Sequence, residues 1–147
     1  MTSVKQPKKR FIRRGGAEQE DASNLKLGEE FDNAQCLYLS EVRVILDAQD
    51  NKGIEVQNRA TTNAVLAKTL EYVRNFSRYN TMEAVREVRQ IMAKDSLTQF
   101  EVAQMANLCC EEAEEARALI PSISTKYDDD ELQEVLNQMQ QIRKFQG

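Results

Sequence analysis

The chain has 147 residues, of which 41% are hydrophobic and 30% are charged, and its formal net charge is −4. This length suits one domain with a modest core. The absence of histidine excludes a Ser-His-Asp or Cys-His nucleophile built from this chain alone. The three cysteines, Cys36, Cys109 and Cys110, lack the spacing of a disulfide framework or a zinc site, so we expect reduced thiols in an intracellular protein.

The composition also predicts the fold class. With only five Gly, two Pro and no Trp, and with many good helix formers, the sequence favours helices. No apolar run approaches the roughly 18–20 residues that span a bilayer, and the N-terminus lacks the apolar stretch of a secretory signal. We therefore expect a soluble all-α protein made in the cytosol, with no membrane contact.

Charge is distributed in blocks along the chain. Residues 1–16 contain six basic and no acidic residues, while the remainder carries a net charge of −10. Within that remainder, residues 59–94 have seven basic and three acidic residues, and residues 17–58 and 95–147 each carry −7. Because phosphate neutralisation supplies most of the affinity of nucleic-acid binders, we expect the acidic body to bind nucleic acid poorly by itself.

The N-terminal residues 1–24 are poor in apolar side chains and are expected to be a disordered tail, basic at first and then acidic. The run KKRFIRR is typical of a nuclear localisation signal or a phosphate-binding tail. A solvated basic tail without a specific role is the alternative. The candidate signal residues are Lys8, Lys9, Arg10, Arg13 and Arg14.

A short arm is expected to precede the helices. Leu25 and Leu27 alternate with polar residues, which favours an extended segment with one apolar face, and Phe31 follows. Such a strand would need an edge on another protein, because no second strand pattern follows in this chain. A coil packed on the chain's own helices is the alternative.

The first helix is expected over 33–49. Ala34, Leu37, Val42 and Ile45 form its apolar stripe, and further apolar residues widen the stripe beyond one face. A helix that is apolar on two sides is either central or shared with a partner. We therefore assign residues 25–147 to one helical domain, with 25–49 as its partner-binding arm and first helix. The candidate partner-binding residues are Leu25, Leu27, Phe31, Leu37, Leu39 and Val44.

Five more amphipathic helices follow, with short connections. Their expected N-terminal caps are Thr61 or Thr62, then Asn80 with Glu83, then Thr98 with Glu101, and lastly two acidic runs. The result is a compact helical bundle. The expected core residues are Leu66, Leu70, Val73, Val88, Ile91, Leu108, Leu119, Leu132 and Leu136.

The two acidic runs, at 111–115 and 128–131, raise the question of a metal or acid/base site. Each run directly precedes an apolar helical pattern, where backbone N–H groups and the helix dipole favour negative charge. Helix starts therefore explain both runs. The sequence contains no Gly-rich phosphate loop before a strand, so we expect neither catalysis nor a cofactor, a metal or a small-molecule substrate.

The basic block in the middle of the chain is a candidate for a weak contact with RNA. Its arginines lie on two consecutive predicted helices, away from most of their apolar positions. A solvated helix face is the commoner explanation of such a pattern. The candidate RNA contacts are Arg74, Arg78, Arg86 and Arg89.

Several segments, in order, resemble the family of fourth subunits of eukaryotic RNA polymerase II. They are EDASNLKLGEEF (20–31), SEV (40–42), KTLEYVRNFSRY (68–79), FEVAQMANLC (100–109), EEAEEARALIPSI (111–123) and DDELQEVLNQ (129–138). No single motif is specific for the family, but the agreement of all these segments in the same order from residue 20 onward is specific. Cys110 departs from the family, where proline often follows the preceding cysteine.

The resemblance implies a fold like the C-terminal domain shared by helicases and RNase D. It implies a heterodimer with the seventh subunit, forming a stalk on the polymerase core near the RNA exit path in the nucleus. The implied roles are transcription initiation and transcript handling, without catalysis. Two alternatives stay open: the equivalent subunit of another nuclear RNA polymerase, and a free-standing helical nucleic-acid-binding domain.

Overall fold

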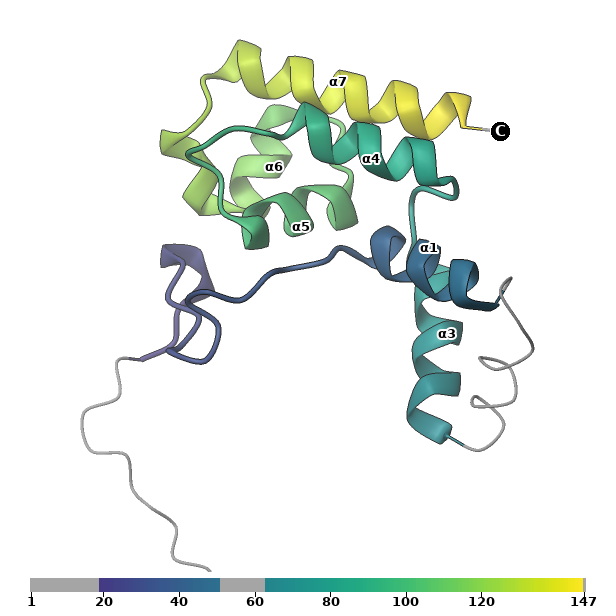
Figure 1. The fold of residues 1–147 in the computed structure, drawn as a ribbon. Helices are drawn as coiled ribbons and strands as arrows, with labels where there is room; N and C mark the ends of the chain where they lie inside the picture. The colour runs from purple at the N-terminus through teal and green to yellow at the C-terminus, as the bar shows by residue number, and fades with distance from the viewer. Residues whose placement is uncertain (1–18, 51–62, 147) are drawn as a thin grey trace, which may run out of the picture.

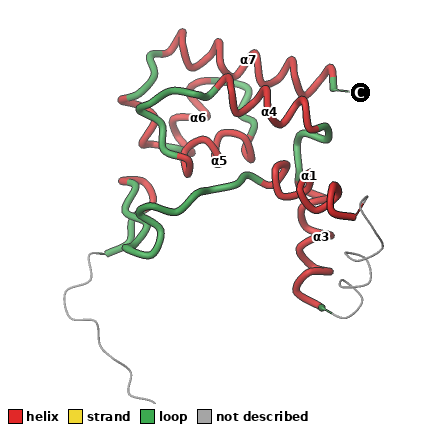
Figure 2. Tube along the Cα trace, viewed as in Figure 1, coloured by secondary structure: helices red, strands yellow, loops and turns green. Residues whose placement is uncertain are grey.

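The structure, a computed structural model, describes residues 19–50 and 63–146, and it is helical (Figures 1 and 2). No strand is found in these two segments, so the all-α prediction is confirmed. In chain order the elements are the 3₁₀ helix η1 (Ala22–Asn24), α1 (Leu39–Asp50), α3 (Ala64–Phe76), α4 (Met82–Ile91), α5 (Gln99–Leu108), α6 (Ala113–Leu119), the 3₁₀ helix η2 (Pro121–Thr125) and α7 (Asp129–Phe145).

The described residues form three parts. The bundle, residues 82–145, has α4 and α7 side by side at the top of Figure 1, with α5 and α6 below them. The α1/α3 pair lies at one side of the bundle, where α1 contacts α3, α4 and α5. The arm, residues 19–38, runs below α5 and leads into α1, and η1 at its far end lies against η2.

Capping boxes start two helices of the bundle. The box predicted at Thr98 and Glu101 is confirmed, because Thr98 Oγ1 accepts the N–H of Glu101 at 3.2 Å and Glu101 Oε1 accepts the N–H of Thr98 at 3.0 Å. Asp128 and Glu131 form an equivalent box at the start of α7. The acidic run at 128–131 therefore starts a helix, as the sequence predicts.

The cap of α4 differs from the prediction. Thr81 caps this helix by accepting the N–H of Ala84 at 3.2 Å, whereas the predicted cap was Asn80. Asn80 is engaged elsewhere, since its Oδ1 accepts from Arg43 and its N–H donates to Gln146 Oε1. A tertiary contact has thus moved the start of the helix by one residue.

The start of α3 falls beside the gap in the described residues. The predicted caps Thr61 and Thr62 lie outside these residues, and Asn63 caps the helix by accepting the N–H groups of Val65 and Leu66. At α6 the acidic run 111–115 lies across the first turn, but its N-cap residue makes no side-chain hydrogen bond. The acids of that run can therefore favour α6 only through the helix dipole.

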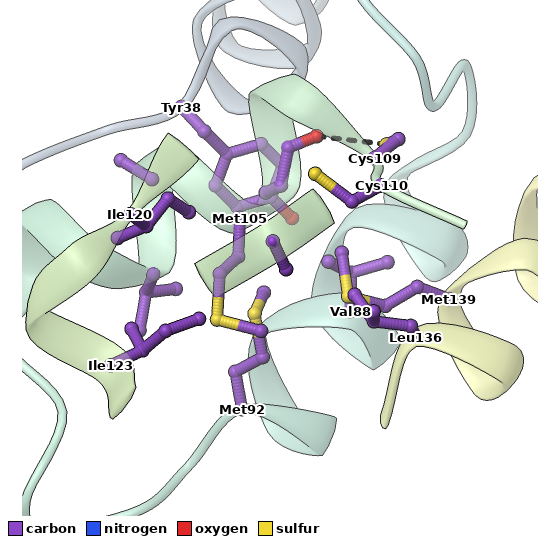
Figure 3. Close-up of a cluster of buried hydrophobic side chains, with 14 of the residues drawn as sticks. Tyr38, Val88, Met92, Met105, Cys109, Cys110, Ile120, Ile123, Leu136 and Met139 are labelled. Carbon is purple, nitrogen blue, oxygen red and sulfur yellow. Dashed lines mark hydrogen bonds between the residues drawn. The ribbon is translucent and has the colours of Figure 1, made fainter. Parts of the chain in front are cut away.

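The core lies inside the bundle, and Figure 3 shows a large part of it. The prediction is right for Leu70, Val73, Val88, Leu132 and Leu136, which are all buried. Two of these, in α3, are buried outside the main cluster, so the α1/α3 pair has a small core of its own.

The predicted core is wrong at two helix ends. Leu108 and Leu119 are 42% and 51% exposed, because each is the last residue of its helix, where the chain turns away from the core. Met105 in α5 and Ile120 directly after α6 are buried instead, and both are 1% exposed. Leu66 and Ile91 are only half-buried.

The first helix begins at Leu39, six residues after the predicted start at Asn33. Two N–H groups near this start bond to side chains of α5: Cys36 donates to Gln99 Oε1 at 2.8 Å and Leu39 donates to Asn107 Oδ1 at 2.9 Å. Residues 34 and 37 therefore belong to the arm and not to a helical stripe.

Candidate protein interface on the arm and the first helices

The end of the arm is a small folded loop around η1. Asp21 and Lys26 exchange two backbone hydrogen bonds of 2.8 and 2.9 Å, which close the loop. Leu25 has a left-handed conformation (φ 58°), so the prediction of an extended segment is wrong at this residue. The alternative, a coil packed on the chain's own helices, describes this part of the arm, because η1 lies against η2.

Gly28 makes the turn that follows. Its φ of +93° is unfavourable for residues with a side chain, and an added Cβ would lie 3.2 Å from Glu20 Oε1. The N–H of Phe31 donates to the Gly28 carbonyl at 2.9 Å, which closes the turn and fixes the backbone of Phe31. The turn therefore sets where this aromatic side chain lies.

An apolar groove of about 800 Å³ lies between the arm and the start of α5. We call it the arm groove, and its apolar lining residues are Leu25, Leu27, Phe31, Leu37 and Phe100. Phe31 and Leu37 are 58% and 49% exposed, although both are large and apolar. Contiguous exposed apolar surface of this kind usually marks a binding site. Four of the six predicted partner-binding residues thus meet in one groove.

The arm is anchored to the bundle beside this groove. The Tyr38 side chain is fully buried, and its hydroxyl donates to the Val85 carbonyl at 2.5 Å. Arg89 Nε donates to Glu41 Oε2 at 2.8 Å, and its Nη2 donates to the Cys36 carbonyl at 3.2 Å. Burial raises the pKa of Tyr38, and the hydrogen bond to Glu41 raises the pKa of Arg89, so the first stays neutral and the second charged.

The two predicted partner-binding residues in α1 lie away from the groove. Leu39 and Val44 are half-buried, and Val44 packs against the bundle core. The sequence did not single out the exposed apolar side chains on this pair, Val65 (74%), Tyr72 and Phe76 (55%) of α3 among them.

The four candidate RNA contacts are not equivalent. Arg89 belongs to the anchor of the arm, and Arg74 forms an ion pair of 3.4 Å with Asp47 of α1. Arg78 and Arg86 are exposed. Burial raises the pKa of the Cys109 thiol, and the positive charges of Arg78 and of Arg143 in α7 partly oppose this. Arg143 was not singled out from the sequence. The candidate localisation residues, Lys8 to Arg14, lie outside the described residues.

The buried ionisable groups of the bundle have structural partners. Burial raises the pKa of the thiols of Cys109 and Cys110, which disfavours their nucleophilic thiolate forms. Burial also opposes the charge of Glu101, but hydrogen bonds from Lys126, Thr98 and Ser122 outweigh it and lower its pKa. Within 19–50 and 63–146, no group of three or more metal-ligating side chains and no helix able to cross a membrane is found.

Comparisons with known proteins agree on one family. A family model described as RNA polymerase Rpb4 matches residues 36–143. The chain is 39% identical over 136 residues to the DNA-directed RNA polymerase II subunit 4 of Arabidopsis thaliana, covering 89% of this chain and 99% of that protein. It is 40% identical over 129 residues to the subunit rpb4 of the same polymerase from Schizosaccharomyces pombe, covering 87% of this chain and 95% of that protein. Identity to subunit 4 of the Arabidopsis polymerases IV and V is 25%, over 77% of this chain.

Proposed function

Because this chain belongs to the RNA polymerase Rpb4 family, we propose that it is the fourth subunit of a nuclear RNA polymerase II and acts there without catalysing a reaction itself. In this proposal it forms a stalk heterodimer with the seventh subunit near the RNA exit path, and the seventh subunit connects it to the polymerase core. Its roles are in transcription initiation and transcript handling.

The observation that carries the heterodimer proposal is the arm groove. Leu25, Leu27 and Phe31 line a groove that residues 19–50 and 63–146 leave open, and none of them belongs to the core cluster of the bundle. Covering this surface would remove apolar area from water, which is the main driving force of association. This exposed apolar lining supports a role of the groove in a complex.

The anchor of the arm supports the same proposal. Tyr38 and Arg89 fix the base of the arm to the bundle, so the groove has a defined position before a partner arrives. The exposed side chains of Val65 and Phe76 on α3 add a second apolar surface. Obligate interfaces are typically large and rich in such residues.

A pull-down from nuclear extract tests this proposal. The tagged native chain should recover the seventh subunit together with the polymerase core. A triple variant, Leu25→Ser, Leu27→Ser and Phe31→Ser, should lose both, because polar side chains would occupy the groove. Leu119→Ser is the control, since Leu119 is 51% exposed, close to the 58% of Phe31, but lies at the end of α6. Full recovery by the triple variant would refute the role of the arm.

The same experiment separates the alternatives. Recovery of the core subunits of another nuclear polymerase would replace RNA polymerase II, although identity favours the latter, with 39% against 25% within Arabidopsis. A free-standing nucleic-acid-binding domain would instead shift RNA or DNA in a gel without any partner. The acidic body opposes this alternative, because it repels phosphates.

We also propose that the run KKRFIRR at 8–14 directs the chain to the nucleus. Replacing Lys8, Lys9, Arg10, Arg13 and Arg14 with alanine should reduce nuclear accumulation of a fluorescent fusion. The matched control removes five basic residues from exposed positions elsewhere in the chain. Equal accumulation of the tail variant and the native chain would leave only a solvated tail or import together with the partner.

A further inference from the structure

A second groove, of about 580 Å³, lies between α4 and α7, and Figure 1 shows these helices on the other side of α5 from the arm. Glu83 and Glu87, one helical turn apart on α4, lie along one side of it. Ile91 and Ile142 give it an apolar lining, and at one end the side chain of Phe145 is 77% exposed. We call it the α4/α7 groove.

The two glutamates of this groove lack compensating charges. Like charges four residues apart on a helix repel each other. Neither Glu83 nor Glu87 forms an ion pair with any residue in 19–50 or 63–146, and none of the described residues that line the groove is basic. The groove therefore combines an apolar lining with two negatively charged carboxylates, on one side, that form no ion pair with the described residues.

The groove is held open by contacts at its end. Gln146 Oε1 accepts the N–H of Asn80 at 2.7 Å, and its Nε2 donates to the Arg78 carbonyl at 2.8 Å. These bonds fix the end of α7 to the connection between α3 and α4. Because α4 and α7 also pack along each other, a ligand would meet a preformed site.

We propose that the α4/α7 groove binds a segment of another protein in which lysine or arginine side chains flank an aromatic or aliphatic pair. The hydrocarbon stems of such residues would lie along Ile91 and Ile142, while their cationic ends meet Glu83 and Glu87. The apolar pair would cover Phe145. Nucleic acid does not fit, because its phosphates would face the two carboxylates. This inference does not depend on the heterodimer proposed above.

A synthetic peptide tests the inference, and residues 7–15 of this chain, PKKRFIRRG, supply a sequence of the required kind. The peptide is titrated into the isotope-labelled full chain in which Lys8, Lys9, Arg10, Arg13 and Arg14 are replaced by alanine, so that its own copy of the segment does not compete, and amide chemical shifts are followed by NMR. We expect saturable shift changes centred on α4 and α7. The double variant Glu83→Gln, Glu87→Gln should weaken binding about three- to tenfold, as for the loss of two surface ion pairs.

Two controls make the test specific. The double variant Glu111→Gln, Glu115→Gln removes two charges with the same sequence spacing, one just before α6 and one in its first turn, and should bind the peptide like the native chain. A peptide carrying Phe11→Ala and Ile12→Ala should bind more weakly, because it lacks the apolar pair. The proposal is overturned if the peptide causes no shift changes, if they centre outside α4 and α7, if the two double variants behave alike, or if a single-stranded RNA produces the same changes.

Discussion

The bundle and the arm use apolar side chains in opposite ways. In the bundle, residues such as Met105, Ile120 and Leu132 are almost completely buried by the chain itself. In the arm, Phe31 and Leu37 are half-exposed beside a groove, although they are as apolar as the residues of the core. The first region is complete within one chain, whereas the second leaves apolar surface for another molecule to cover.

The boundary between these regions lies at Tyr38. Its side chain belongs to the core cluster, while the residues before Cys36 contribute nothing to that cluster. A domain should therefore keep its stability when the chain is cut before Cys36 and lose it when the core is damaged. Variants on the two sides of this boundary test the comparison directly.

The largest effect is expected in the core. Leu132→Ala should lower the free energy of unfolding by about 2–5 kcal/mol, because Leu132 is fully buried and alanine would leave a cavity. Phe31→Ala, its counterpart in the arm, should change that free energy by less than about 0.5 kcal/mol. Urea unfolding of both variants provides the measurement. Equal losses would show that the arm belongs to the cooperative core.

The next effect concerns the buried carboxylate of the bundle. At neutral pH, Glu101→Gln should lower the free energy of unfolding by about 1–3 kcal/mol, because Lys126 loses its charged partner. The folded-state pKa of Glu101 lies below the reference value of 4.5. Its contribution is therefore complete above pH 4.5 and is lost as the pH falls through the folded pKa.

The pH dependence distinguishes the loss of the Glu101 charge from a general loss of packing. Urea unfolding of the native chain and the Glu101→Gln variant should differ at pH 7 and converge as the pH is lowered past 4.5. Thr69→Val, a change of similar size at a half-buried site far from Glu101 in the sequence, should show no such convergence. A constant difference over this range would mean that the ionised form of Glu101 contributes nothing.

A smaller effect on stability, but a large effect on binding, is expected from deleting residues 20–32. The melting temperature should fall by less than about 2 °C, since about 1 kcal/mol shifts a domain of this size by roughly 2–8 °C. Recovery of the seventh subunit should fall strongly, because five lining residues of the arm groove are removed, among them Leu25, Leu27 and Phe31. A drop of several degrees with full partner binding would reverse the roles that we assign to the arm and the bundle.

The smallest effect on stability is expected at the exposed arginines. Arg78→Ala combined with Arg86→Ala should leave the melting temperature unchanged, because both side chains are exposed. In the assembled polymerase, this variant should reduce crosslinking of nascent RNA to the chain. Lys68→Ala on α3 serves as a control with an equally exposed cation. Crosslinks found on the seventh subunit alone would contradict an RNA role for the basic block.

Features fixed by local interactions could be predicted from the sequence. The box at Thr98 and Glu101 depends on two residues three positions apart, so its pattern is visible in the sequence. The arm could not be predicted in this way. Its course is set by the burial of Tyr38 and by Gln99, which lies 63 positions from the N–H of Cys36 that it binds. Tertiary contacts of this kind leave no periodic signal and moved the start of the first helix.

The candidate site was predictable in part for the same reason. The apolar residues Leu25, Leu27 and Phe31 could be identified because they precede the first predicted helix. Leu37 was identified as part of a helical stripe, which the structure does not contain at that residue. That they form a groove with Phe100 depends on the fold and could not be foreseen. The role of Arg89 was also hidden, since its partner Glu41 is 48 residues away.

The folded loop at η1 has a consequence for the kinetics of assembly. Asp21 accepts hydrogen bonds from Ser23 and Asn24, and the turn at Gly28 is already closed. Fixing a backbone residue costs about 1–2 kcal/mol, so a loop ordered in advance avoids much of this cost when a partner arrives. Loosening the loop, as Gly28→Ala would, should therefore slow the association with the partner even though no contact with the partner is removed.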